Sequence, residues 1–233
     1  MSARLLPGDA LEHSLRRGFI DEYQERIVAG WPAGTRVLDL GGHRVAKRGT
    51  FDLARFGFRV VCLNLTGDKR PDVRGDANTL PFRDATFDAV VCAEVLEHVG
   101  DPRHVIAEVE RVLKPGGSFV ATVPFLVHIH GDPQDYGRYT DTFWRMVLTH
   151  VGFTDLAIER QGGFWSVQWD ALREWVRVGR QHAGRRRWRW AVAARVLGRV
   201  REAAVAADVR CAPGSRLRQF TTGFGMAARK ALP

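Results

Sequence analysis

The alternation of short apolar runs with longer amphipathic segments is the feature that most restricts the fold of this chain. Apolar runs lie at 35–42, 59–65, 87–95 and 118–125, with a shorter one inside 71–77, and helical patterns separate several of them. Strands that alternate with helices in this way form βαβ units. Right-handed crossovers then predict an α/β protein with a doubly wound, mostly parallel sheet and helices on both faces.

The predicted strands end in small or polar residues. These residues are Asp39, Gly41, Gly42, Asn64, Asp76, Ala93 and Glu94. The carboxyl ends of parallel strands meet at one edge of a sheet, and ligands bind there, close to the point where the strand order reverses. The sequence therefore predicts one binding site, formed by the first half of the chain.

The rest of the chain divides into further helices and two more strands. We expect the strands at 153–159 and 220–229. The helices are expected at 9–29, 46–57, 101–113, 141–152, 164–179 and 186–207. Asp9 is the predicted N-cap of the first helix, and Gly30 is its predicted end.

Four sequence segments carry a family resemblance. They are RVLDLGG, RGDANTLPF, FDAVVCAEVLEHV and VLKPGGSFVATVPF, in this order. Together they resemble the class I S-adenosylmethionine (SAM)-dependent methyltransferases, in the type 11-like branch that serves small molecules, glycans and natural products. The resemblance implies a Rossmann-like sheet of seven strands, six of them parallel and the last antiparallel.

The resemblance also implies how the chain is organised. We expect a single class I methyltransferase domain over residues 1–233. Its parts are an N-terminal helical cap (1–33), a SAM-binding core (34–160), a basic helical insertion or lid (161–217) and the last strand (218–233).

The resemblance implies SAM as the cofactor. Asp39 would order the glycine loop, Asp76 would accept from the adenine amino group, and Asn64 stands where the family usually has an acid that holds the ribose. The full set of implied cofactor residues is Asp39, Gly41, Gly42, His43, Asn64, Leu65, Asp76, Ala77, Asn78, Ala93, Glu94 and His98.

Three positions depart from the family pattern. His43 and Val45 stand where the glycine loop of the family often has glycines. His43 either crowds the cofactor or binds its methionine carboxylate. Asn64 lacks the charge that strengthens a hydrogen bond to ribose. A SAM-binding protein without methyl transfer therefore stays open as an alternative.

The resemblance implies that the segment 124–140 (PFLVHIHGDPQDYGRYT) forms the acceptor side of the site. A histidine, with a pKa of ~6.5, suits the deprotonation of a hydroxyl acceptor. His130 is the predicted general base, His128 is the reserve, and Tyr136 completes the predicted catalytic set. The predicted substrate contacts are Asp135, Arg138, Tyr139 and Trp165. The alternative is structural: Asp135 pairs with Arg138, and Tyr139 packs into the core.

No metal site is predicted. The three cysteines, Cys62, Cys92 and Cys211, form no CxxC pair. Glu94 and His98 have no second histidine nearby in the sequence to complete a ligand set. The cysteine usage and an N-terminus without an apolar core segment predict a reducing, cytoplasmic location.

The net charge of +9 comes largely from residues 173–201, which hold ten arginines and one acid, Glu174. The first interpretation of these basic helices is a lid, or a subunit interface in a homodimer. A second is contact with an anionic membrane or a lipid-linked acceptor, because basic helices with tryptophan can lie at an interface. Contact with nucleic acid is the third and least favoured.

These observations predict transfer of a methyl group from SAM to a small-molecule or glycan acceptor, at oxygen in preference to nitrogen. An RNA methyltransferase is the alternative enzyme.

Overall fold

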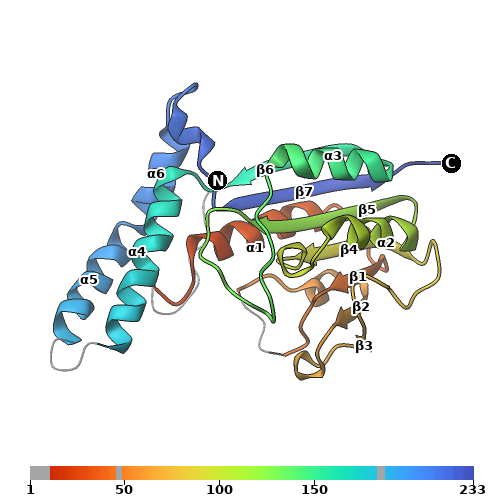
Figure 1. Cartoon of the computed structure of the whole chain (residues 1–233), viewed down its shortest axis with the longest axis horizontal. Coiled ribbons are helices and arrows are strands. Elements are labelled where there is room, and N and C mark those ends of the chain that lie inside the picture. The colour runs from red at the N-terminus through yellow and green to blue at the C-terminus, as the bar shows by residue number, and fades with distance from the viewer. Residues whose placement is uncertain (1–10, 46–48, 183–186) are drawn as a thin grey trace.

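The computed structural model describes residues 11–45, 49–182 and 187–233, and it contains one sheet flanked by helices (Figure 1). The strands are β1 (Arg36–Leu40), β2 (Arg59–Asn64), β3 (Val73–Arg74), β4 (Phe87–Ala93), β5 (Leu113–Pro124), β6 (Phe153–Gln161) and β7 (Gly223–Lys230). Their order is β3-β2-β1-β4-β5-β7-β6. Only β7 runs antiparallel to its neighbours, β5 and β6. The predicted seven-stranded fold class is confirmed.

One face of the sheet is covered by α2 (Pro102–Val112) and α3 (Asp141–Val151). Side chains alternate between the two faces along a strand, so Leu38 and Leu40 of β1 point to this side. They belong to the main buried cluster together with Ile106 of α2 and Trp144 of α3. Full burial of each such aliphatic side chain stabilises the fold by ~1.5–3 kcal/mol.

The opposite face is covered by α1 (Leu15–Val28) and by an aromatic segment, 51–58. Val37 of β1 lies in a buried cluster with Val28 of α1 and Leu53. The two faces are thus covered by different parts of the chain, as a doubly wound sheet requires.

The prediction of a helix over 46–57 is wrong for residues 49–57, which are the part of this range that the structure describes. Residues 49–57 contain a short 3-10 helix at Leu53–Phe56, and 46–48 lie outside the described residues. The Asp21 carboxylate of α1 accepts from the Thr50 backbone N–H at 2.6 Å. The backbone N–H of Thr50 is therefore bound by α1, and the segment does not form a helix of its own before Leu53.

The predicted start of the first helix also needs correction. α1 begins at Leu15, and its N-cap is Ser14, whose hydroxyl accepts from the Arg17 N–H at 3.1 Å. Asp9, the predicted N-cap, lies outside the described residues. Asp170 on a distant helix supplies the second cap, because its carboxylate accepts from the N–H groups of Leu15 (2.7 Å) and Arg16 (3.1 Å). A cap from so far along the chain leaves no local sequence signal.

Three helices form an arm beside the sheet (Figure 1): α4 (Phe164–Gln181), α5 (Arg187–Arg199) and α6 (Arg201–Arg210). Trp169 and Val176 of α4 are buried with Leu15 and Phe19 of α1. Trp165, Leu172 and Trp175 of α4 are exposed. Within the described ranges, no helix combines the length and the apolar character that a membrane span requires.

The arm is tied together by a second long-range cap. Asp208 of α6 accepts hydrogen bonds at the start of α4 from the N–H groups of Gly163 (3.0 Å), Trp165 (2.8 Å) and Ser166 (2.9 Å) and from the Ser166 hydroxyl (2.6 Å). A Cβ on Gly163 would come within 2.7 Å of the Asp208 carboxylate. α6 therefore caps α4, and α4 in turn caps α1.

Replacement of Asp208 by alanine is expected to lower the free energy of unfolding by about 1–3 kcal/mol, because several N–H donors at the start of α4 lose their hydrogen-bond acceptor. Urea denaturation followed by circular dichroism measures the change. Glu202→Ala, on the exposed side of the same helix, is the control and should stay within about 0.5 kcal/mol of the parent. Equal stability of the two variants would contradict the capping role.

Candidate functional site

A cavity of about 540 Å³ opens at the carboxyl ends of β1, β2 and β4. The strand order reverses between β1 and β4, which is where such sheets bind ligands. The predicted cofactor residues that line it are Asp39, Gly41, Gly42, His43, Asn64, Leu65, Asp76, Ala77, Ala93, Glu94 and His98. Among the predicted catalytic residues, His130 also lines it. The strand ends thus meet at one cavity.

Several lining residues were missed from the sequence. Arg17 and Gln24 reach the cavity from α1, and Lys69 reaches it from the turn after β2. Arg17 and Gln24 are seven positions apart and so lie on one side of a helix. This spacing in the sequence would have been enough to predict that a polar face of α1 lines the site.

The turn after β1 requires both of its glycines. Gly41 has φ +78°, and a Cβ there would come within 2.3 Å of Val95 Cγ2. A Cβ on Gly42 would come within 2.1 Å of Asp39 Oδ2. The turn is therefore packed between Val95 and the Asp39 carboxylate, and it directs the next residue, His43, to the cavity wall.

Asn64 shapes this turn from the neighbouring strand. Its Nδ2 donates to the carbonyl oxygens of Gly41 and Gly42, each at 3.0 Å, and its Oδ1 accepts from the Thr66 N–H at 3.2 Å. A carboxylate could not donate to the two carbonyls. The amide hydrogens of Asn64 therefore bind backbone carbonyl groups of the protein. The residue pattern did not predict this role.

Asn78 is the predicted cofactor residue that does not line the cavity. Its backbone N–H and its Nδ2 both donate to Asp76 Oδ1, at 2.9 Å each. Asn78 therefore fixes the orientation of the Asp76 carboxylate from the side away from the cavity.

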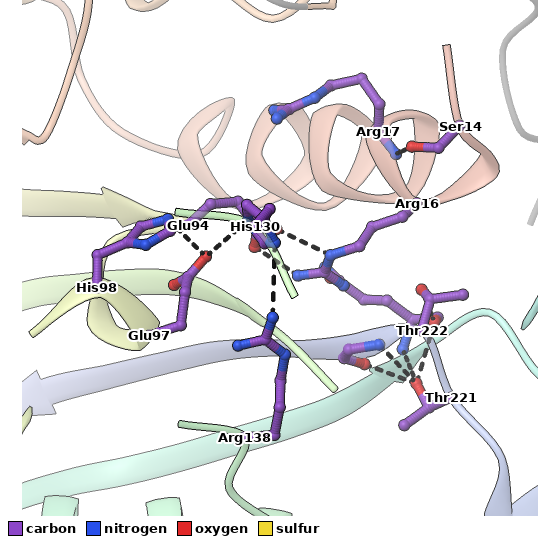
Figure 2. A network of polar contacts seen from close by, with 12 residues as sticks. Ser14, Arg16, Arg17, Glu94, Glu97, His98, His130, Arg138, Thr221 and Thr222 are labelled. Atoms are coloured by element: carbon purple, nitrogen blue, oxygen red, sulfur yellow. Dashed lines mark hydrogen bonds and ion pairs between the residues drawn. The ribbon is translucent and has the colours of Figure 1, made fainter. Parts of the chain in front are cut away.

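A buried ion pair joins α1 to the end of β4 (Figure 2). Arg16 is 4% exposed; its Nε donates to Glu94 Oε2 at 2.9 Å, and its Nη2 donates to Glu94 Oε1. Burial alone would raise the pKa of Glu94, but the guanidinium outweighs it and holds the pKa below its usual range. Glu94 is therefore an ionised residue in the wall of the cavity. Arg16 was not predicted as a site residue, because an arginine at its position is equally consistent with a solvent-exposed helix face.

Glu97, on the short 3-10 helix Leu96–His98, is the most unusual group near the cavity. Its residue is 1% exposed, and neither carboxylate oxygen has a hydrogen-bond partner. Burial, and then the charge of Glu94, raises its pKa well above the usual range. The nearest polar atoms facing it are His98 Nε2 (3.5 Å) and His130 Nε2 (3.9 Å).

The two histidines face Glu97 in the same way (Figure 2). His98 Nδ1 lies 2.5 Å from the Gln134 carbonyl oxygen, and His130 Nδ1 lies 3.2 Å from the His128 carbonyl oxygen. A carbonyl oxygen only accepts, so we assign the ring proton of His98 to Nδ1. His130 Nδ1 also lies 3.5 Å from Arg138 Nη2, which can only donate, and we place the His130 proton on Nδ1 because the contact with the His128 carbonyl is the shorter one. Each Nε2 then offers a lone pair. Burial lowers the pKa of His130, which favours its neutral form.

Asp135, Arg138 and Tyr139 do not line the cavity. Arg138 binds both oxygens of Asp135, and this contact lowers the pKa of Asp135 to about 2. Asp135 Oδ2 also accepts from the His130 backbone N–H at 2.9 Å. Tyr139 stacks on Phe143 with a centroid separation of 4.2 Å. The geometry matches the structural alternative, in which this pair stiffens the loop.

The remaining predicted residues also lie away from the cavity. His128 is exposed, Tyr136 is 59% exposed, and Trp165 on α4 is 45% exposed. No described residue beyond Pro133 lines the cavity, so the arm contributes none of its wall. The lid function of the arm therefore stays a prediction.

Replacement of Arg16 by methionine should leave the Glu94 charge without its partner. We expect a loss of about 2–4 kcal/mol in the free energy of unfolding, slightly below the value for a fully buried pair because the Glu94 side chain is 16% exposed. The double variant Arg16→Met/Glu94→Gln should recover part of this loss, since it removes the unpaired charge. Urea denaturation of both proteins is the measurement, and an equal loss in both would contradict the pairing argument.

Comparison with known proteins agrees with this geometry. Residues 46–121 match the family model described as a methyltransferase domain. The chain is 35% identical over 114 residues to a sarcosine/dimethylglycine N-methyltransferase of Aphanothece halophytica, covering 42% of this chain and 40% of the relative. It is 36% identical over 122 residues to a demethylmenaquinone methyltransferase of Renibacterium salmoninarum, covering 48% and 52%. The chain thus spans about half or less of these relatives.

Solved structures share the fold over nearly the whole chain. The [4+2]-cyclase SpnF superposes with a TM-score of 0.58 at 22% identity, covering 93% of this chain and 81% of its own. A 1,6-didemethyltoxoflavin-N1-methyltransferase of Burkholderia thailandensis, solved with S-adenosylhomocysteine, gives a TM-score of 0.53 at 16% identity, covering 91% and 78%. In its sheet order, its glycine turn and the methyltransferase domain matched over residues 46–121, the chain is similar to the class I SAM-dependent methyltransferases.

Proposed function

We propose that this protein transfers a methyl group from SAM to a small-molecule acceptor. The observation that carries the proposal is the cavity at the carboxyl edge of the sheet, which is lined by Asp39, the two-glycine turn and Asp76. The sarcosine and demethylmenaquinone methyltransferases among the relatives have small acceptors in their names. The toxoflavin methyltransferase structure carries the demethylated cofactor product.

The cavity offers a matching group for each end of SAM. The adenine amino group would donate to Asp76, whose carboxylate Asn78 orients. The amino-acid end would lie on the turn of Gly41 and Gly42, where the absence of side chains permits a close approach. Arg17 and Lys69 give the wall positive charge, which suits the methionine carboxylate.

On the acceptor side, His130 supports an oxygen nucleophile. Methyl transfer from a sulfonium is an in-line displacement, so much of the rate comes from holding the two reactants at ~3 Å. A hydroxyl acceptor must also lose its proton, and the Nε2 lone pair of His130 at the cavity wall would accept it. A neutral amine acceptor would need no such group. A glycan hydroxyl fits this chemistry as well as a phenol does.

A SAM-binding protein without methyl transfer is the second candidate. His43 lines the cavity at a position where the family often has glycine. The fold neighbour named as a [4+2]-cyclase indicates that this architecture is not restricted to methyltransferases. Release of S-adenosylhomocysteine during incubation with acceptors separates the two candidates.

Asp76→Ala should weaken SAM binding several-fold or more, because the adenine amine would lose its acceptor in a cavity. Isothermal titration calorimetry with SAM on the full chain measures the effect. Asp84→Ala is the matched control: Asp84 lies before β4, at the opposite edge of the sheet, and pairs with Arg111 on the surface. An unchanged affinity in Asp76→Ala would remove the proposed cofactor placement.

His130→Ala should lower the rate of S-adenosylhomocysteine formation by about 10²-fold or more, the usual effect of losing a general base. Its SAM affinity should change far less. His104→Ala, an exposed histidine on α2, is the control. Equal turnover of the two variants would show that His130 does not activate the acceptor.

A further inference from the structure

We infer that Glu97, His98 and His130 form a binding site for a divalent transition-metal ion at the edge of the SAM cavity. One ligand atom from each residue lies within 4.8 Å of the other two. Glu97 and His98 come from the 3-10 helix after β4, whereas His130 comes from the loop after β5. The fold alone brings these two segments together.

The first argument is the state of Glu97. Its carboxylate is buried, and both of its oxygens lack hydrogen-bond partners. Buried polar groups nearly always have partners, because an unsatisfied one is costly. The groups that Glu97 Oε1 faces are two imidazole nitrogens. A cation placed among these atoms would satisfy the carboxylate and both nitrogens together.

The second argument is the orientation of the histidines. Both direct Nε2 toward Glu97. Nδ1 of His98 contacts the Gln134 carbonyl oxygen, and Nδ1 of His130 contacts the His128 carbonyl oxygen at 3.2 Å and Arg138 Nη2 at 3.5 Å. Metal-bound histidines almost always have such an outer partner, which fixes the tautomer and the ring plane. The rings stand at 89° with centroids 5.2 Å apart, so their nitrogen lone pairs converge without the rings stacking.

The third argument is that neighbouring cations are already paired. Arg16 binds Glu94, and Arg138 binds both oxygens of Asp135. Neither guanidinium is hydrogen-bonded to Glu97, whose oxygens have no partner. The carboxylate thus faces the histidines instead of an arginine, and an ion would not have to displace an ion pair.

The Glu97–histidine distances are close to the spacing of ligands around one ion. Ligands bonded at about 2.0–2.2 Å to one ion lie about 3–3.6 Å from one another. The two Glu97–histidine distances, 3.5 and 3.9 Å, are close to that range. Two imidazoles and one carboxylate suit Zn²⁺, Mn²⁺, Fe²⁺ or Co²⁺, whereas Mg²⁺ prefers oxygen ligands. His130 is far along the chain from the Glu97-His98 pair, so residue spacing did not predict this site.

The position of the site gives the ion a role that rests on the proposed function. His98 and His130 line the cavity, so the open coordination positions face its interior. A hydroxyl bound to the ion has a lowered pKa, and its proton leaves to solvent. Its oxygen then bonds to the methyl carbon as the sulfur–carbon bond breaks and the sulfonium becomes a thioether. In this state His130 is a ligand and the ion replaces it as the activating group.

The test uses metal-stripped, tag-free full chain in equilibrium dialysis against Zn²⁺, Mn²⁺ or Mg²⁺, with bound metal measured by mass spectrometry. We expect one Zn²⁺ or Mn²⁺ per chain, bound at least 10-fold more tightly than Mg²⁺. Glu97→Gln, His98→Ala and His130→Ala should each weaken binding at least 10-fold. His104→Ala and Cys211→Ser should leave it unchanged. No binding, a preference for Mg²⁺, or binding that the three ligand variants leave intact would overturn the proposal.

A thermal melt separates loss of the site from loss of the fold. The ion should raise the melting temperature of the parent protein, because a ligand that binds the folded state stabilises it. Glu97→Gln should melt normally without metal but gain nothing when Zn²⁺ or Mn²⁺ is added, and a gain equal to that of the parent would contradict the site. SAM affinity of Glu97→Gln, measured by calorimetry, should match the parent. Metal binding and SAM binding can thus fail independently.

Discussion

The buried pair of Arg16 and Glu94 is the interaction on which the arrangement of the site depends. The guanidinium lies where α1 meets the ends of β4, β6 and β7: it contacts Gln161, and a Cβ on Gly223 would come within 1.8 Å of it. A desolvated charge of this kind is tolerated only when it is paired. The pair therefore fixes α1 against the carboxyl edge of the sheet. α1 then carries Arg17 and Gln24 to the cavity, and its N-terminus receives the Asp170 cap from the arm.

The sequence predicted the sheet and the location of the site because both follow from local patterns. Apolar runs that end in Asp39, Asp76 and Ala93 must bring those residues to one edge once the strands are parallel. The helix expected over 46–57 failed for the opposite reason. Asp21 takes a backbone donor of this segment, a contact between separate segments that periodicity does not encode.

Within the site, the direction of its hydrogen bonds shows the role of a residue better than its type does. The family resemblance implies that Asn64 stands where an acid usually holds the ribose, yet its amide donates to the two glycine carbonyls of the adjacent turn. An acid at this position would repel those carbonyls, so the asparagine and the two-glycine turn form one unit. The Glu97 cluster was beyond sequence reasoning because its members come from two segments, and its decisive property is a buried carboxylate without partners.

The loop after β5 connects the two halves of the candidate site. Gln134 accepts from His98, the Tyr136 N–H donates to the Glu97 carbonyl at 2.8 Å, and Asp135 accepts from the His130 N–H. Arg138, by holding Asp135, therefore sets the position of His130 without touching the cavity. Since one loop supports both histidines, a displacement of this loop would move the acceptor side while the glycine turn and Asp76 stay on the rigid sheet. If the proposed function holds, cofactor affinity and acceptor chemistry are therefore separable properties of this fold.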